Sequence, residues 1–345
     1  MPATQGLPIL DFSAFYGENP KAKAQLVEQV RESCLHNGFF QITGHRIPLE
    51  LQHRAMNCSK RFFRLPLEEK LKIDKIEKNT FNRGYELLQS QMNEAGASPD
   101  LKEGLYIGRE IPTDHPYFLE GLLNSGPNQW PDTIPDPEEF QKSTMEYYHA
   151  VFDLAKDIMA VLALTLNHDE AYFDPLTDGA VATLRYLHYP PPPKQMGERL
   201  RGIGAHTDFS CITLLLQDEV SGLQVLDVPT NEWIDVQPIP GAYVVNLGNL
   251  FSRMTNDTYK SNLHRVINDS GNDRYSIPFF LTGNPKYVCK CLPGFQKDGE
   301  PGKYLPATVQ EVVSLSYKET FARAERYKAE IQTKIQNNVT KEVAA

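Results

Sequence analysis

The chain has 345 residues, of which 41% are hydrophobic and 23% are charged, the composition of a globular protein that can bury a large core as one domain or two closely fused ones. Its formal net charge of −9 argues against a nucleic-acid-binding surface, which requires clustered Lys and Arg. No apolar run is long enough to span a membrane, and the first residues do not resemble a signal peptide, so we expect a cytoplasmic protein with no membrane partner.

The N-terminal part of the chain predicts a mixture of helices and strands. Apolar residues recur at helical spacing over 19–38 and again over 49–73, where Pro66 should interrupt the helix. Short apolar runs over 7–15 and 39–45 are typical of strands.

The middle of the chain predicts a long loop followed by a long helix. Residues 80–135 are rich in Gly, Pro, Asn and Asp, which favours irregular structure, and a loop of this length inside a compact domain is often functional. Residues 138–166 form the longest stretch with helical periodicity, and we expect this helix to brace a sheet.

After residue 180 the sequence pattern changes to short apolar runs bounded by Pro, Gly and Asn. These runs predict an antiparallel sandwich or barrel. The predicted strands are 181–189, 203–217, 222–227, 242–247, 262–267, 274–281 and 286–289. Helical spacing returns over 308–336, so helices should flank an all-β core in an α+β fold.

The cysteines predict no disulfide framework and no zinc site. They are odd in number and thinly spread, which is typical of reduced thiols, and the pair in Cys289-x-Cys291 has no second pair to complete a metal site. The five are Cys34, Cys58, Cys211, Cys289 and Cys291.

The stretch GAHTDFSCITLLLQD, residues 204–218, places His206 and Asp208 two positions apart at the start of an apolar run. Strand alternation would point both side chains to the same face. His264 opens another short apolar strand in SNLHRVIND. Two His and one carboxylate suit non-haem Fe(II) and oxygen chemistry, although either His alone is more often an ordinary core or surface residue.

The stretch RYSIPFF, residues 274–280, predicts an anion site. Alternation puts Arg274, Ser276, Pro278 and Phe280 on one face of a strand. An inward Arg is costly unless it meets an anion, and its planar fork suits a carboxylate. We therefore expect a ligand that carries a carboxylate, which the motif alone does not identify.

The order of these motifs resembles the 2-oxoglutarate- and Fe(II)-dependent dioxygenases, and more narrowly their isopenicillin N synthase-like branch. The similarity covers nearly the whole chain, through LPILDFSAF, GFFQITGH, LRYLHYPPPP, GAHTDFSCITLLLQD, GLQV, VVNLGN, HRV and RYSIPFF in the family's order. It implies a jelly-roll (double-stranded β-helix) core flanked by N-terminal, central and C-terminal helices. Within one structural unit, 1–120 would be a mixed α/β region and 121–345 the helix-braced catalytic core, with its motifs at 181–290 and a C-terminal helix.

The resemblance implies roles for individual residues. The positions that match the family's iron ligands are His206, Asp208 and His264, and those that match its 2-oxoglutarate-binding residues are Arg274, Ser276 and Tyr189. Asn249 in VVNLGN stands where the family usually has Asp, a position that is not an iron ligand. The implied reaction uses Fe(II), O2 and 2-oxoglutarate as cosubstrate, which is decarboxylated to succinate and CO2, with no catalytic residue beyond the metal centre.

Four further stretches, NRGYE, DLKEGLYIGRE, TLRYLHYP and NDTYKSNLHRV, resemble fungal thymine-hydroxylase-like members of the branch. The matching substrate-binding positions are Asn82, Arg185, Phe209 and Phe280. Phe209 stands where that group has Tyr, and the missing hydroxyl weakens any transfer of thymine specificity. Asn82 also suits a simple turn, and the partner of Arg185 is left open between 2-oxoglutarate, the substrate and Glu103.

The sequence therefore predicts an oxygenase that hydroxylates, desaturates or cyclises a small polar molecule: a pyrimidine, an amino acid or a secondary-metabolite intermediate. One alternative is an iron oxidase like isopenicillin N synthase, which uses no 2-oxoglutarate. The other is a non-catalytic metal- or ligand-binding protein. The sequence leaves the oligomeric state open, and we expect the C-terminal helix to pack along the barrel rather than cover its mouth.

Overall fold

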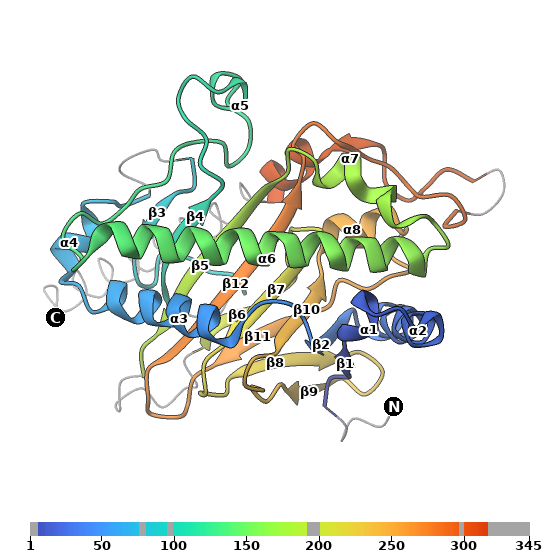
Figure 1. Ribbon diagram of the computed structural model, residues 1–345, viewed down its shortest axis with the longest axis horizontal. Coiled ribbons are helices and arrows are strands. Elements are labelled where there is room, and N and C mark those ends of the chain that lie inside the picture. Colours follow the sequence, from blue (N-terminus) through green and yellow to red (C-terminus); the bar gives the residue numbers. More distant parts are fainter. Residues whose placement is uncertain (1–5, 76–80, 95–98, 192–200, 297–299, 317–345) are drawn as a thin grey trace, which may run out of the picture.

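Two β-sheets face each other at the centre of the computed structural model (Figure 1), which describes residues 6–75, 81–94, 99–191, 201–296 and 300–316. The larger sheet has the strand order β1-β2-β10-β7-β12-β5-β4-β3 and is antiparallel except for the β1–β2 pair. Its strands are β1 Ile9–Asp11, β2 Phe39–Thr43, β3 Gly84–Glu86, β4 Glu103–Gly108, β5 Val181–Tyr189, β7 Ile212–Gln217, β10 Tyr243–Leu247 and β12 Arg274–Gly283.

The smaller sheet has the order β6-β11-β8-β9 and is antiparallel throughout. Its strands are β6 Arg201–His206, β8 Leu223–Asp227, β9 Glu232–Asp235 and β11 His264–Ile267. A separate two-stranded sheet pairs β13 Val288–Cys289 with β14 Ala307–Thr308.

Helices cover the outer face of the larger sheet, where α6 runs across the strands and packs against α2, α3, β7 and β12 (Figure 1). Pro137 in the first turn of α6, followed by two glutamates, suits the start of a helix. The helices are α1 Ser13–Tyr16, α2 Pro20–His36, α3 Leu49–Phe63, α4 Leu67–Leu71, α5 Pro116–Leu119, α6 Pro137–Thr165, α7 Asp174–Thr177 and α8 Asn249–Met254, with a 3₁₀ helix at Glu170–Phe173.

The predicted α+β class and the antiparallel two-sheet core are confirmed. The break near Pro66 separates α3 from α4, and β5 has the predicted bounds. Residues 309–316 are helical, and the rest of the helix predicted over 308–336 lies outside the described residues. Among the described helices none is long and apolar enough to cross a membrane.

The prediction of irregular structure throughout 80–135 is wrong, because β3 and β4 lie within this region. Every residue of β4 is buried, so its sequence lacks the polar–apolar alternation that marks a half-exposed strand. The single run predicted over 203–217 is also two strands, β6 and β7, which belong to different sheets. The short strand β9, whose residues are exposed or half-buried, was not predicted from the sequence.

Gly38 fixes the junction between α2 and β2. Its φ of +74° lies in the left-handed region, and a Cβ there would sit 1.9 Å from the carbonyl oxygen of Lys260. The residue is thus constrained by both its backbone conformation and the neighbouring chain.

We expect Gly38→Ala to lower the midpoint of thermal unfolding far more than Gly271→Ala. Gly271 has a similar φ of +76° but open space around its Cβ position, so its substitution should cost only the left-handed penalty of about 1–2 kcal/mol. Calorimetry on both variants makes the comparison, and equal losses would contradict the role of the Lys260 contact.

Candidate metal centre and substrate pocket

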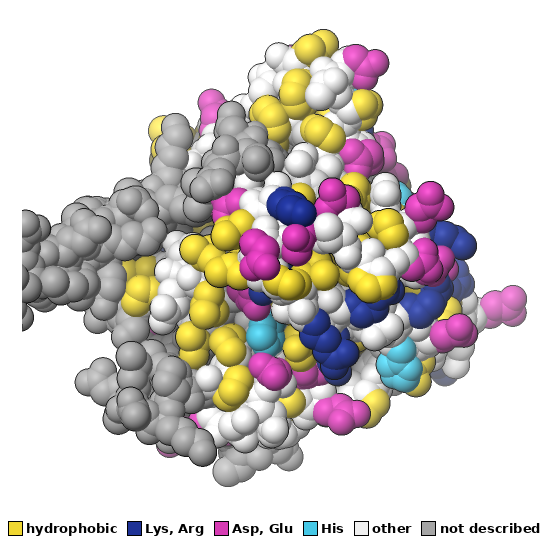
Figure 2. All heavy atoms as spheres, turned by 90° about the vertical axis from the view of Figure 1, so that its left-hand side faces the viewer, with side chains coloured by type: hydrophobic (Ala, Val, Ile, Leu, Met, Phe, Trp, Pro, Cys, Tyr) yellow, Lys and Arg dark blue, Asp and Glu magenta, His cyan; other side chains and the backbone are white. Residues whose placement is uncertain are grey.

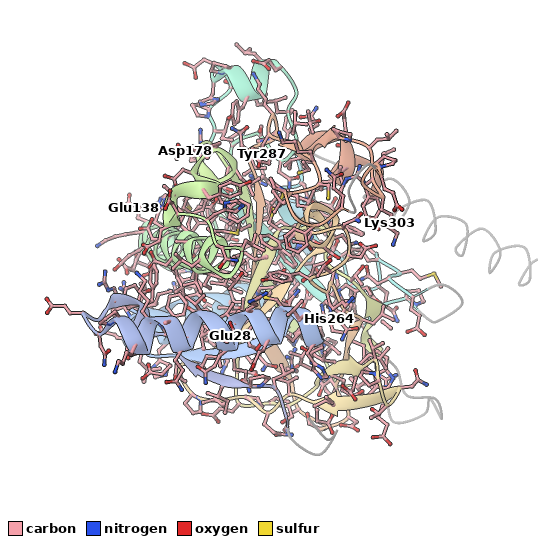
Figure 3. All side chains as sticks on the ribbon, turned by 90° about the vertical axis from the view of Figure 1, so that its right-hand side faces the viewer. Glu28, Glu138, Asp178, His264, Tyr287 and Lys303 are labelled. Carbon is pink, nitrogen blue, oxygen red and sulfur yellow. The ribbon has the colours of Figure 1, made fainter. Side chains whose placement is uncertain are left out.

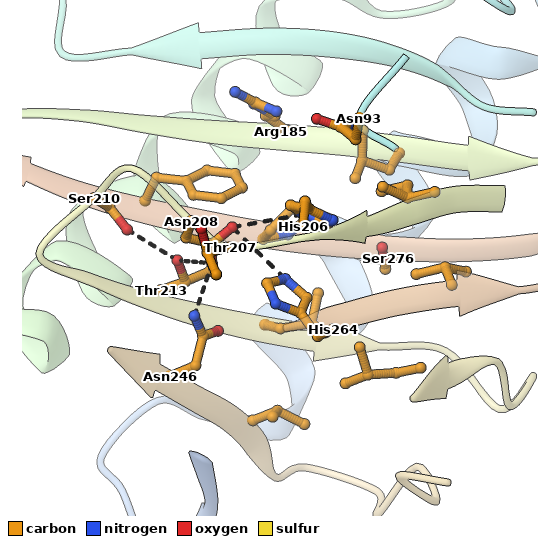
Figure 4. Close-up of a pocket in the computed structure, with 18 of the residues that line it drawn as sticks. Asn93, Arg185, His206, Thr207, Asp208, Ser210, Thr213, Asn246, His264 and Ser276 are labelled. Carbon is orange, nitrogen blue, oxygen red and sulfur yellow. Dashed lines mark hydrogen bonds and ion pairs between the residues drawn. The ribbon is translucent and has the colours of Figure 1, made fainter. Parts of the chain in front are cut away.

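The pairing of β6 with β11 brings two histidines and an aspartate together between the sheets. His206 ends β6 and stands opposite His264, the first residue of β11. Nε2 of His206 lies 3.7 Å and Nε2 of His264 3.6 Å from Oδ1 of Asp208 (Figure 4). In Figure 3, His264 lies in the interior of the molecule, whereas Lys303 lies at its edge. We call His206, Asp208 and His264 the metal triad.

Strand alternation does not place Asp208, contrary to the reasoning from the sequence. β6 ends at His206, so Asp208 belongs to the loop that follows the strand. The backbone N–H of Asn249 donates to the Asp208 carbonyl at 2.8 Å, and the Asn249 amide donates to the Thr207 hydroxyl at 3.1 Å. The first residue of α8 therefore holds the loop that contains Thr207 and Asp208 in place through these two hydrogen bonds.

Neighbouring groups orient each ligand atom of the metal triad. Nδ1 of His206 lies 2.8 Å from the Gly204 carbonyl and Nδ1 of His264 3.3 Å from the Asn262 carbonyl. A proton on each Nδ1 donates to these carbonyls and leaves the Nε2 lone pairs directed at Asp208.

The carboxylate of Asp208 is held in the same way. Its Oδ2 accepts hydrogen bonds from Thr213 at 2.6 Å and from the Asn246 amide at 2.8 Å, which leaves Oδ1 facing the histidines (Figure 4). These contacts satisfy one oxygen inside the protein and leave the other available to a cation.

The surroundings of His206 and Asp208 favour the protonation states of these two side chains that bind metal. Burial and then the neighbouring His264 lower the pKa of His206 well below its usual value. Burial opposes ionisation of Asp208, but His264, His206, Asn246 and Thr213 together hold its pKa below the usual range. Neutral imidazole and ionised carboxylate are the forms that bind metal.

The donor set fits Fe(II). The three ligand atoms lie within 4.8 Å of one another, and in the described part of the chain no other cluster of His, Cys, Asp or Glu side chains makes such a group. Two imidazoles and one carboxylate leave coordination positions open, which is the arrangement of non-haem Fe(II) oxygenases.

Arg274 lines the pocket that contains the metal triad and is fully buried. Its Nε donates to the Val220 carbonyl at 3.1 Å and its Nη2 to Gln217 at 2.9 Å, while Nη1 has no hydrogen-bond partner among the described residues. The guanidinium lies 4.9 Å from the ring centre of Tyr189, whose hydroxyl is 3.4 Å from the Ser276 hydroxyl. A buried cation with an unsatisfied donor fits a carboxylate.

Three of the four predicted substrate-binding residues line the same pocket: Arg185, Phe209 and Phe280. The guanidinium of Arg185 lies between two aromatic rings, 4.4 Å from the centre of Tyr106 and 4.5 Å from that of Phe280. This stacking stabilises the cation through the electron-rich ring faces.

The structure does not bring Asn82 to the pocket. Its backbone has a φ of +62°, and its amide donates to Asn124 at 3.3 Å, so the side chain is directed into the loop region instead. Glu103 does not contact Arg185 either. It pairs with His188 in the β4–β5 register, on the opposite face of the sheet, and its carboxylate bonds to Lys70, Tyr85 and His188.

The pocket is also lined by polar residues that the sequence did not predict, among them Gln91, Asn93 and Lys102. Figure 4 shows Asn93 and Arg185 on one side of the metal triad and Asn246 on the other. No pattern in the sequence marked these residues, because β3 and β4 lie in the region that was predicted to be a loop and β4 is buried on both faces. Val313, from the helical residues 309–316, also lines the pocket.

Comparison with known families decides the class of this site. Residues 7–133 match the model described as non-haem dioxygenase in morphine synthesis N-terminal, and residues 180–283 match the 2OG-Fe(II) oxygenase superfamily. A fungal relative, the 2-oxoglutarate-Fe(II) type oxidoreductase hxnY of Emericella nidulans, is 67% identical over 95% of this chain and 94% of its own. This chain belongs to the 2OG-Fe(II) oxygenase superfamily.

Two other relatives show the breadth of the family around this chain. Clavatol oxidase claD of Penicillium crustosum is 42% identical over 85% of this chain and 90% of its own length. The crystal structure of a full-length Neurospora crassa protein in complex with α-ketoglutarate and thymine matches with a TM-score of 0.79 and 30% identity, covering 90% of this chain and 98% of that one. Both are similar to this chain over nearly its whole length.

Membership confirms the expected jelly-roll core, the enzyme class and the cofactors Fe(II), 2-oxoglutarate and O2. It favours the oxygenase over the two alternatives left open by the sequence. The structure and the family thus agree on a small-molecule oxygenase.

We expect Asp208→Ala to abolish Fe(II) binding, because it removes the one anionic donor of the metal triad. Asn246→Leu should weaken binding by about 10–100-fold, since it only frees the orientation of that carboxylate. Anaerobic calorimetric titration with Fe(II) measures both, with the exposed Asp269→Ala as the matched control. Unchanged affinity in Asp208→Ala would refute the assignment.

Proposed function

We propose that the metal triad holds the iron and that Arg274, Ser276 and Tyr189 hold the distal carboxylate of 2-oxoglutarate. The observation that carries this proposal is Nη1 of Arg274, which is buried and has no hydrogen-bond partner in the described ranges. It belongs to the same pocket as the triad. A dicarboxylate can therefore reach the guanidinium with one end and the metal with the other.

The protein contributes position and exclusion of water. When bound, Fe(II) and 2-oxoglutarate supply the oxidising chemistry, in which O2 is consumed and succinate and CO2 are released. Arg274 fixes the cosubstrate, and a small apolar cluster made by Leu187, Tyr189, Ile203 and Val266 lines the pocket. Apolar walls strengthen the electrostatic contacts inside the site and keep solvent from the reacting atoms.

The remaining end of the pocket, formed by Arg185, Phe209 and Phe280, is proposed as the substrate site. Two aromatic rings and a stacked guanidinium suit a small, flat and polar molecule. Relatives support this class through their names: one is a clavatol oxidase, and another was crystallised with thymine. A pyrimidine or a secondary-metabolite intermediate fits the site better than an extended chain, and Phe209 offers no hydroxyl at the rim. Asn82 is left out of the proposed site.

A cytoplasmic location and the absence of a nucleic-acid partner belong to the same proposal. All five cysteines are free, which is typical of a reducing compartment. The face shown in Figure 2 mixes acidic and basic side chains among hydrophobic ones, so its described part carries no extended basic surface.

A substrate screen tests the reaction. Candidate ring compounds are added anaerobically to the enzyme loaded with Fe(II) and 2-oxoglutarate, and their binding is followed through the iron–cosubstrate charge-transfer absorbance. Air is then admitted, and O2 uptake, succinate and oxidised product are quantified. Formation of succinate in step with product supports the proposal, whereas product without succinate would identify an oxidase that uses no 2-oxoglutarate.

We expect Arg274→Met to raise the half-saturating concentration of 2-oxoglutarate by about 10–100-fold or more, because hydrogen bonds to charged groups contribute roughly 1.5–3 kcal/mol each. The exposed Arg31→Ala, on α2, is the control. Anaerobic titration of the charge-transfer absorbance with 2-oxoglutarate measures the change. Equal half-saturation in both variants would rule out the proposed role of Arg274.

A further inference from the structure

A buried ion cluster lies against one wall of the pocket. Glu86 of β3 is 1% exposed and accepts hydrogen bonds from Nζ of Lys75 at 2.6 Å, Nζ of Lys102 at 2.5 Å and the hydroxyl of Tyr106 at 2.9 Å. Burial opposes its ionisation, but Lys102, Lys75 and Arg185 together hold its pKa well below the usual range. Glu86 is therefore a carboxylate that two lysines share.

The two lysines are not equivalent. Lys102 is 2% exposed and lines the pocket, whereas Lys75 does not. An ammonium group has three donors. In Lys102 two of them are used, by Glu86 and by Gln91 at 2.9 Å, and the third has no partner among the described residues. The ammonium of Lys75 lies 3.8 Å from the centre of the Tyr106 ring, behind the wall.

The backbone places Lys102 on the same side as the substrate end of the pocket. Tyr106 of β4 stands opposite Arg185 of β5, and Gly104 stands opposite Leu187. Alternation puts Lys102 on the face that carries Gly104 and Tyr106. Gly104 presents no side chain on this face, so Lys102 and Arg185 both reach the pocket.

Lys102 brings a buried ammonium group to the lining of the pocket. Among the described residues that line it, the charged ones besides the histidines are Asp208, Arg274, Lys102 and Arg185. Asp208 faces the histidines, and Arg274 is assigned to 2-oxoglutarate. The N–H of Lys102 that no described residue accepts is therefore available to the substrate.

Asp100 does not accept the third N–H of Lys102. Its carboxylate accepts hydrogen bonds from the Gly204 amide and from Asn93, and burial raises its pKa to about 6. A buried ammonium donor without an acceptor is costly, so an electron-rich oxygen of the substrate is the natural partner.

We propose that the third N–H of Lys102 donates to a substrate oxygen, either an oxyanion or a carbonyl, at the edge of the ring that lies beside Arg185. Lys102 is then a specificity-determining residue that rejects substrates without such an oxygen. This inference rests on the proposed function, because it assumes that the substrate shares the pocket with iron and 2-oxoglutarate.

Three probes with one ring test the proposal: benzoate carries an oxyanion, benzamide a neutral carbonyl, and toluene no acceptor. Dissociation constants are measured anaerobically on the enzyme loaded with Fe(II) and 2-oxoglutarate. We expect the wild type to bind at least one of the two oxygen-bearing probes about 10-fold or more tightly than toluene. A preference for benzoate over benzamide identifies an oxyanion, and equal binding identifies a carbonyl.

Two variants separate a role in binding from a role in packing. Lys102→Met should lose the preference over toluene, whereas Lys75→Met should keep it, although each leaves Glu86 with a single lysine. If Lys102→Met does not fold, Lys102→Gln keeps a donor for Glu86 without the charge and should lose the preference for an oxyanion.

Several results of these measurements would contradict the proposed role of Lys102. The role of Lys102 is overturned if Lys102→Met keeps the preference over toluene, or if Lys75→Met loses it to the same extent. It is also overturned if the wild type prefers neither oxygen-bearing probe over toluene or binds none of the three probes. The charge-transfer absorbance recorded before any probe is added is the separate control. If 2-oxoglutarate produces no such absorbance, the proposed function fails; if it does, only the inference about Lys102 fails.

Discussion

The site depends on holding one ionised carboxylate between two histidines inside the protein. Asp208 is 5% exposed, and its charge persists there because Thr213 and Asn246 satisfy one oxygen while the histidines face the other. Such a carboxylate would be costly to bury without these partners. The β6–β11 pairing and the loop fastened by Asn249 both serve this arrangement.

Around that centre, a single strand spans the two ends of the pocket. Arg274, at the start of β12, stands at the proposed cosubstrate end, and Phe280, further along the same strand, stacks on Arg185 at the proposed substrate end. Pairing of β12 with both β5 and β7 fixes the spacing between them. The long helix α6 packs on the opposite side of the sheet, so the strands that carry the site rest on a rigid support.

Much of this arrangement could be predicted from local pattern. Alternation along RYSIPFF placed Arg274, Ser276, Pro278 and Phe280 on one face, and all four line the pocket. The same rule failed for Asp208, because the pattern does not show where β6 ends and a loop begins. The order of the motifs was enough to predict the family, because this order is a property of the whole chain and does not depend on the bounds of any one strand.

The contacts that the sequence could not give are those made across the sheet between distant segments. Glu86 and Lys102 meet only because β3 pairs with β4, and a strand buried on both faces and rich in glycine resembles a loop in sequence. Asn82 likewise lies outside the pocket because its backbone is left-handed and its side chain bonds to Asn124, which is 42 residues away in the sequence. Tertiary pairing decided these positions, and local propensity did not.

The most direct test of the proposed centre is a crystal structure of the anaerobic complex with Fe(II) and 2-oxoglutarate. We predict one metal ion bound by Nε2 of His206, Nε2 of His264 and Oδ1 of Asp208, with the distal carboxylate of the cosubstrate on Nη1 of Arg274. A metal ion held by other residues, or a cosubstrate whose distal carboxylate lies on Arg185 instead of Arg274, would contradict it.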